Sequence, residues 1–220
     1  MLVEVWSDVV CPWCYIGKRR FEEAQRRLAA DDEFTEPIEV VYRPYQLDPR
    51  AAPGTTMPVA EAYARKFGGP EAAAQIIAHI TGVAAGEGLE FHLERAQRAN
   101  TRDAHRLLGL ALEQGGATVQ GAVKERLLRA YFTAGEDVSD PDVLAHVGAD
   151  AGLDEAAVRR VLESETGIAE LDAALALAVE AEITAVPTYV LDGRWAVPGA
   201  QDPDTFVQVL KRLTARARAS

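Results

Sequence analysis

The sequence has few cysteines, few positive charges and no long apolar run. Only 2 of its 220 residues are cysteines, which excludes a small fold held together by several disulfides. Its 23 Lys and Arg residues are outnumbered by 34 Asp and Glu residues, for a net charge of −11. Nucleic-acid recognition needs clustered cations, so no nucleic-acid partner is expected. No apolar stretch of about 20 residues occurs, so no membrane span is expected.

The rest of the composition is that of an ordinary folded protein, with 48% hydrophobic and 26% charged residues. The first apolar run, Leu2–Trp6, begins directly after Met1 and leaves no room for a signal peptide. We therefore expect a cytoplasmic protein. In that reducing compartment, isolated structural disulfides are uncommon and catalytic dithiols are the usual exception.

Both cysteines lie in one four-residue motif, Cys11-Pro12-Trp13-Cys14. Two cysteines at this spacing can close a disulfide with little movement of the backbone. Such a short loop would stabilise the fold by only about 2 kcal/mol on the loop-entropy model. The pair is therefore interpreted as chemically active and not as a structural cross-link.

The segment from Pro12 to about Ala30 has helical periodicity, with one apolar stripe. The stripe consists of Cys14, Gly17, Phe21, Ala24 and Leu28. This spacing predicts that Cys14 faces the core, whereas Cys11 is exposed at the start of the helix. The two sulfur atoms are thus expected to differ in their access to solvent.

At a helix N-terminus, unpaired N–H groups and the helix dipole stabilise a thiolate at Cys11. Cys11 is therefore the candidate nucleophile and Cys14 the candidate resolving thiol. Two other interpretations are a half-site for zinc and a pair of inert core thiols. Zinc in a structural site needs four ligands, and none of the four histidines has ligand-like spacing to this pair.

The two residues between the cysteines are candidate substrate-binding residues. Pro12 presets a helical backbone angle at the first helical position. Trp13 offers a large aromatic surface beside the sulfur, although a core position is the alternative. Because Trp13 carries no positive charge, the reduction potential of the Cys11–Cys14 disulfide is expected to be less oxidising than about −120 mV, the value of a strongly oxidising dithiol protein.

Along the chain, a strand, a helix and a second strand precede a long helical region that is rich in Ala and Leu. Glycines at 68–69, 86–88, 115–116, 135 and 152 divide that region into several helices. A hairpin around Asp192-Gly193 and a last helix follow. These elements predict an α/β fold in which residues 1–48 and 182–220 form a discontinuous domain around a helical insertion of residues 49–181. Prolines 49, 53 and 58 mark the first boundary.

The chain resembles the DsbA-like thioredoxin-fold family, and its FrnE branch in particular. The resemblance extends over nearly the whole chain. It is carried by the segments 7–18, 42–48, 100–107, 130–137, 186–189 and 198–201, of which the first, with Cys11-Pro12-Trp13-Cys14, is the most specific.

This resemblance implies a thioredoxin-like fold with a helical insertion, and thiol–disulfide oxidoreductase or isomerase activity. It further implies that Pro187 is in the cis form and faces the cysteines, although trans is the default for such a bond. The backbone of Val186 would then pair with an extended substrate. Helix capping and packing adequately explain three further matching residues, Asn100, Arg102 and His105.

The chain departs from the family pattern at Ala185, where glycine is usual, and at Tyr189, where phenylalanine is usual. It also lacks the second cysteine pair of some relatives, which excludes mechanisms that need two internal dithiols. No tightly bound cofactor is expected beyond the redox-active Cys11–Cys14 disulfide, with glutathione as a possible co-substrate.

The expected partners are protein or small-molecule thiols and disulfides, and the oligomeric state is left open between monomer and homodimer. One alternative is a glutathione-dependent isomerase or kappa-type glutathione transferase of the same architecture. Those enzymes usually have serine in place of Cys11 and need no dithiol. The other alternative is a non-catalytic redox-sensing adaptor.

Overall fold

The computed structural model describes residues 1–52, 54 and 57–219, so Pro53 of the predicted connector lies outside the described residues. In this part of the chain a mixed sheet has the strand order β2–β1–β3–β4. Its strands are β1 Leu2–Ser7, β2 Glu39–Pro44, β3 Thr188–Leu191 and β4 Trp195–Pro198. β1 is parallel to β2 and antiparallel to β3, and β3 forms the predicted hairpin with β4.

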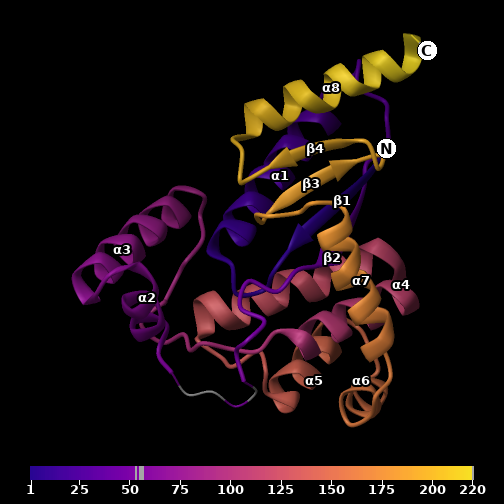
Figure 1. The fold of residues 1–220 in the computed structure, drawn as a ribbon. Helices are drawn as coiled ribbons and strands as arrows, with labels where there is room; N and C mark the ends of the chain where they lie inside the picture. The colour runs from indigo at the N-terminus through magenta and orange to yellow at the C-terminus, as the bar shows by residue number, and fades with distance from the viewer. Residues whose placement is uncertain (53, 55–56, 220) are drawn as a thin grey trace.

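Two helices, α1 (Pro12–Ala29) and α8 (Pro203–Ala219), pack together next to the sheet (Figure 1). The predicted apolar stripe of α1 is buried from Cys14 to Leu28. The C-terminal half of this stripe packs against side chains of β1, β3 and α8 in one apolar cluster. The cluster contains Val3, Val5, Phe21, Ala24, Leu28, Tyr189, Leu191, Phe206 and Leu210. Burial of this stripe holds α1, and with it both cysteines, against the sheet.

The region between β2 and β3 is helical, as predicted. It contains α2 Val59–Phe67, α3 Pro70–Gly86, α4 Arg102–Arg129, a π-helical turn at Ala130–Ala134, α5 Pro141–Asp150, α6 Glu155–Leu162 and α7 Ile168–Glu180. Gly68 ends α2 with a left-handed backbone, and Gly116 (φ 65°) kinks α4 at a predicted break. The break between α6 and α7, which includes Gly167, was not predicted.

The helical region joins the sheet along β2, where α4 and α7 contact that strand. The side-chain amide of Gln120 accepts from the Tyr42 N–H (2.8 Å) and donates to the Tyr42 carbonyl (2.9 Å). It thereby satisfies backbone groups that an edge strand would otherwise expose. Val9, Tyr15 and Ile16 belong to the apolar cluster of the helical region. The start of α1 thus contributes to both apolar cores. The predicted domain boundaries, between residues 48 and 49 and between 181 and 182, stay a prediction.

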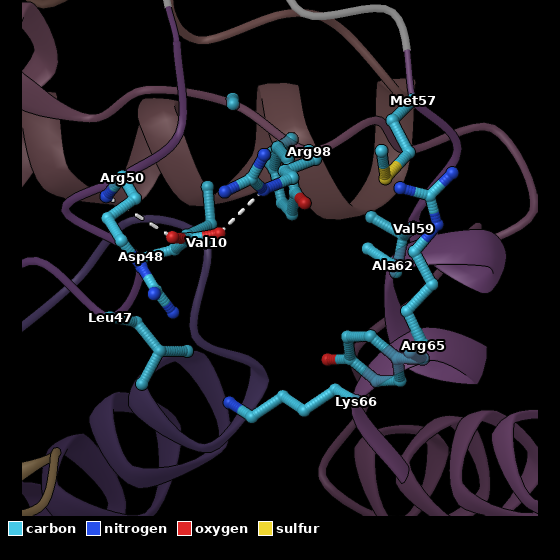
Figure 2. A pocket seen from close by; sticks show the side chains of 13 residues that line it. Val10, Leu47, Asp48, Arg50, Met57, Val59, Ala62, Arg65, Lys66 and Arg98 are labelled. Carbon is cyan, nitrogen blue, oxygen red and sulfur yellow. Dashed lines mark hydrogen bonds and ion pairs between the residues drawn. The ribbon is translucent and has the colours of Figure 1, made fainter. Parts of the chain in front are cut away.

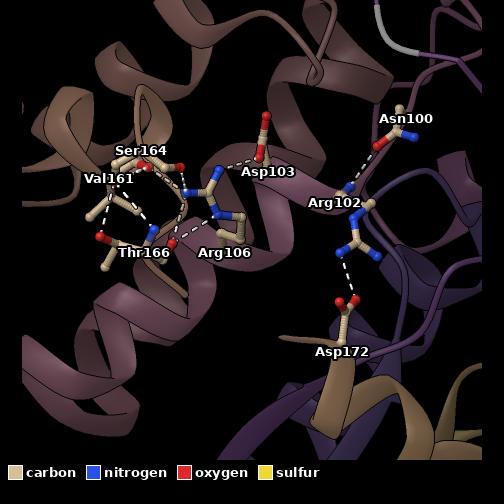
Figure 3. Close-up of polar contacts among 8 residues, drawn as sticks. All are labelled: Asn100, Arg102, Asp103, Arg106, Val161, Ser164, Thr166 and Asp172. Carbon is tan, nitrogen blue, oxygen red and sulfur yellow. Dashed lines mark hydrogen bonds and ion pairs between the residues drawn. The ribbon is translucent and has the colours of Figure 1, made fainter. Parts of the chain in front are cut away.

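A buried arginine ties the loop between α6 and α7 to α4 (Figure 3). The Arg106 guanidinium donates to the carbonyls of Val161, Ser164 and Thr166 and to the Asp103 carboxylate. These acceptors surround a cation that is otherwise costly to bury.

Asn100 and Arg102 act as capping and packing residues, as predicted. Asn100 Oδ1 accepts from the Arg102 N–H (3.0 Å), and the Arg102 guanidinium pairs with Asp172 of α7 (2.6 Å; Figure 3).

Of the helices that the structure describes, none combines the length and apolarity required to cross a bilayer.

Candidate active site

The cysteine motif forms the junction between β1 and α1. Cys11 is the N-cap residue with an extended backbone, Pro12 occupies the first turn, and the Cys14 N–H donates to the Cys11 carbonyl (3.0 Å). Proline fits there because the first helical N–H groups have no partner within the helix. Both cysteines are free thiols, so the structure corresponds to the reduced protein.

The prediction that Cys11 is exposed was wrong. Cys11 is 3% exposed and Cys14 is 2% exposed, so the two thiols do not differ in their access to solvent. Periodicity shows which face of α1 is apolar, but not which distant segment covers the helix end. The loop before β3 is one such segment, since the Cys11 Sγ lies 3.7 Å from the Val186 carbonyl oxygen and donates to it.

That loop contains the Val186–Pro187 bond, which is cis in the structure. The Pro187 carbonyl accepts from the Gly199 N–H (2.7 Å), which fixes the loop to the segment after β4. A Cβ atom at Gly17 would lie 2.8 Å from the Tyr189 hydroxyl and 3.0 Å from the Pro187 Cγ. Glycine at position 17 therefore allows α1 to approach the proline loop closely. The structure brings Val186 and Pro187 next to the cysteines, and their role with a substrate stays a prediction.

The two thiols differ in acidity. A hydrogen bond from the Cys14 thiol lowers the pKa of Cys11, and the N–H groups of Cys14 and Trp13 add to this effect against the opposing effect of burial. Burial, and then the negative charge of Cys11, raise the pKa of Cys14 well above its usual value. Cys11 is thus the stronger acid and Cys14 holds its proton, which is the order required of a nucleophile and a resolving thiol.

The residues between the cysteines are less accessible than predicted. Pro12 is buried. Trp13 is half-buried against the core of the helical region, with its ring centroid 6.3 Å from that of His79 in α3. Part of Trp13 therefore serves as packing surface between α1 and α3.

Sequence reasoning missed a buried acid–base pair beside the motif. Asp8 Oδ1 accepts from His105 Nε2 (3.1 Å) and from the Val9 N–H (2.8 Å), and Oδ2 accepts from the Leu47 N–H (2.7 Å). His105 Nε2 also lies 3.1 Å from the Tyr45 carbonyl, and since both of its partners are acceptors, this nitrogen carries a proton. His105 therefore does more than pack: it fixes the loop that precedes Cys11.

A cavity of about 500 Å³ opens between the loop after β2 and helix α2 (Figure 2). Val10, which directly precedes Cys11 in the chain, and Tyr63 are among the residues that line it. Burial raises the pKa of Tyr63 to about 12, and the negative charge of Cys11 acts in the same direction. The lining includes four cations, Arg50, Arg65, Lys66 and Arg98. Lys66 extends across the opening towards Leu47 (Figure 2). The cavity is thus basic in a protein of net charge −11.

A protein-family model described as the DSBA-like thioredoxin domain matches residues 2–211 of this chain. The chain belongs to this family. A probable DsbA oxidoreductase from Streptomyces coelicolor has the same fold, with a TM-score of 0.87 and 37% identity over 96% of this chain and 89% of that one.

Two further proteins bear on the comparison. An uncharacterized protein of Bacillus subtilis strain 168, YwbO, is 29% identical over 94% of each chain. The cytosolic disulfide reductase DsbM of Pseudomonas aeruginosa, solved with GSH, matches with a TM-score of 0.66. It is 19% identical and covers 98% of this chain and 100% of its own. At that identity the likeness concerns the fold alone.

Over residues 1–52, 54 and 57–219, no group of three or more His, Cys, Asp or Glu side chains is arranged to hold a metal ion. The buried ionisable residues near the dithiol include Asp8, its partner His105 and, on α4, Lys124. Asp8 and His105 lie within segments that match the family, so the sequence contained a signal for them.

Proposed function

We propose that the protein is a thiol–disulfide oxidoreductase or isomerase of the FrnE branch, acting through the Cys11–Cys14 dithiol. The observation that carries this proposal is geometric: two free thiols lie within one turn at the N-terminus of α1, with the Val186 carbonyl 3.7 Å from the Cys11 Sγ. The contrast in acidity between the two thiols supports it. A lowered pKa makes Cys11 the nucleophile, and a raised pKa keeps Cys14 protonated until it is needed.

The reaction proceeds by two exchange steps. The Cys11 thiolate attacks one sulfur of a substrate disulfide, forms a mixed disulfide and releases the first substrate thiolate. Cys14 then loses its proton and attacks the Cys11 sulfur, which releases the second substrate thiolate. The substrate gains two electrons and the dithiol becomes a disulfide. The reverse sequence oxidises a substrate dithiol.

The substrate contacts follow from the segments around Cys11. The Val186 carbonyl, 3.7 Å from the Cys11 Sγ, is the acceptor beside which an extended substrate backbone would lie. Pro187 and the exposed part of Trp13 supply apolar surface, while Pro12 sets the backbone of the helix start. Because Cys11 is only 3% exposed, a small or extended substrate suits the site better than a folded surface.

Glutathione fits the basic cavity as a co-substrate, since it is an anionic thiol. The DsbM structure with GSH supports this proposal only by analogy of fold. Arg98 is already paired with Asp48 (2.6 Å), and Arg65 with Glu61. Of the four lining cations this leaves Arg50 and Lys66, and Lys66, which extends across the opening towards Leu47, is the one best suited to a glutathione carboxylate.

Reversing the charge of Lys66 should weaken the binding of glutathione disulfide. We expect Lys66→Glu to raise the KM for glutathione disulfide about tenfold, because one attraction of about 1 kcal/mol is lost and a repulsion is added. Steady-state kinetics with glutathione disulfide and with neutral bis(2-hydroxyethyl) disulfide measure the effect, and the neutral substrate is expected to be unaffected. Lys211→Glu, on α8, is the matched charge control. An equal loss with both substrates would refute a carboxylate contact.

Turnover of protein disulfides tests the proposed function. The purified protein should reduce insulin in a glutathione buffer and reactivate scrambled ribonuclease, and both activities should disappear in Cys11→Ser. A kappa-type glutathione transferase would instead remain active without Cys14, and an adaptor would turn over neither substrate.

Location, assembly and domain division are also parts of the proposal. The fold relative described as cytosolic supports a cytoplasmic location by analogy, and monomer and homodimer both agree with the fold. Limited proteolysis near residues 49–58 and 181–187 would test whether the helical region of residues 49–181 is a separate domain.

A further inference from the structure

Lys124 of α4 is a buried cation without a hydrogen-bond partner. It is 1% exposed, and its Nζ contacts no hydrogen-bonding group among the described residues. Burying such a group is costly unless a negative charge or an acceptor compensates it. The neighbouring Glu125 does not do so, since its carboxylate binds Lys18, Arg19 and the Tyr15 hydroxyl. The proposed reaction provides the compensating charge.

The fold directs Lys124 towards the layer beneath the cysteines. Gln120, one helical turn earlier, holds α4 to the backbone of Tyr42. The Lys124 Nζ lies 5.6 Å from the centre of the Tyr42 ring. Across the sheet, Tyr42 pairs with Val5, and Val5 pairs with Tyr189. Since the Tyr189 hydroxyl reaches Gly17, this row of side chains runs under the turn of α1 that begins at Cys14.

Cys14 provides the largest of the negative charges that act on Lys124, followed by Asp8 and Cys11, while Lys18 opposes them. In the same way, the charge of Lys124 favours the ionised form of Cys14. Charges interact more strongly in a buried layer than in water, so this attraction acts without a direct contact. The charge of Lys124 thus acts on the sulfur that must become a thiolate in the resolving step.

We propose that Lys124 is a positioning residue whose buried positive charge stabilises the Cys14 thiolate when Cys14 attacks the Cys11 mixed disulfide. This inference rests on the proposed function. Cys14 releases its proton to water, the positive charge of Lys124 stabilises the resulting thiolate, and the Cys14 sulfur bonds to the Cys11 sulfur. The bond from Cys11 to the substrate sulfur breaks, and the substrate thiolate leaves with the electron pair.

The test compares two buried lysines. Lys124→Met removes the unpaired charge, whereas Lys18→Met removes a lysine that is 6% exposed but already paired with Glu22 and Glu125. The Cys11 mixed disulfide with glutathione is prepared, and its resolution by Cys14 is followed by mass spectrometry after acid quenching, from pH 5 to pH 10. We expect Lys124→Met to resolve about tenfold more slowly at pH 7, with a pH midpoint about one unit higher. Lys18→Met should keep the wild-type midpoint.

A second measurement covers the case in which Lys124→Met folds poorly. Lys124→Arg keeps the charge and should keep the wild-type midpoint, and thermal unfolding compares the folding of all variants. The ultraviolet thiolate absorbance of Cys14 in a Cys11→Ser background should titrate about one unit higher when Lys124 is replaced by Met. An unchanged pH midpoint in Lys124→Met would overturn this inference alone. A wild-type protein that forms no mixed disulfide at Cys11 would instead overturn the proposed function.

Discussion

Replacing Cys11 by serine should reduce disulfide exchange by about 10³-fold or more, because a hydroxyl cannot provide the thiolate nucleophile. Replacing Cys14 by serine should have a different effect. Cys11 can still attack, but its mixed disulfide with the substrate cannot be resolved internally. We therefore expect Cys14→Ser to accumulate a covalent substrate adduct within one turnover, detected by mass spectrometry after acid quenching.

The matched pair of serine variants makes this expectation specific. Both substitutions replace one buried sulfur with oxygen, so any general effect on folding should be similar, and thermal unfolding measures it. An adduct on Cys14 in Cys11→Ser, at the rate seen on Cys11 in Cys14→Ser, would contradict the assigned roles. Full turnover by Cys14→Ser would favour a glutathione-dependent enzyme that needs no dithiol.

The largest effect on stability is expected from Asp8→Ala. The Asp8 carboxylate accepts from two backbone N–H groups and from His105. In Asp8→Ala both N–H groups would lose their partner, and His105 would keep only the Tyr45 carbonyl. An unsatisfied buried donor costs about 1–3 kcal/mol. The free energy of unfolding should therefore fall by about 3 kcal/mol or more, with a melting temperature about 10 °C lower. Asp204→Ala is the control, since Asp204 is 78% exposed and should change stability by less than about 1 kcal/mol.

The stabilisation that Asp8 provides should be lost at acidic pH. Burial acts to raise the pKa of Asp8, but the hydrogen bond and charge of His105 outweigh it, and the net pKa is lowered. The contribution of Asp8 is thus fully present above the pKa of an unfolded aspartate, about 3.9, and is lost as the pH falls through the lower folded value. The difference between wild type and Asp8→Ala, measured by urea unfolding, should be constant near neutrality and shrink below about pH 4. A constant difference down to pH 2 would contradict this account.

Much of the fold follows from local patterns in the sequence. The strand at Leu2–Ser7, the helix after Pro12 and the hairpin at Asp192-Gly193 were predicted from periodicity and turn residues, and the structure confirms them. Most breaks in the helical region fall at predicted glycines. These features depend on neighbouring residues, which is why one sequence suffices to predict them.

The features that failed or were missed depend on contacts between distant segments. Cys11 was expected at the surface, but the loop containing Val186 covers it from 175 positions away. The partner of Asp8 is His105, 97 positions away. Lys124 had no visible role, because helical periodicity gives the face of a residue but not the group that this face meets.

The central claim, that Cys11 and Cys14 form one redox-active dithiol, is tested most directly by a redox titration. The protein is equilibrated in buffers of varied glutathione to glutathione-disulfide ratio, alkylated, and weighed by mass spectrometry. We predict one cooperative two-electron transition to a Cys11–Cys14 disulfide, at a potential more reducing than about −120 mV. Wild-type protein that instead retains two free thiols, or a lasting glutathione adduct on Cys11, throughout the titration would contradict the claim.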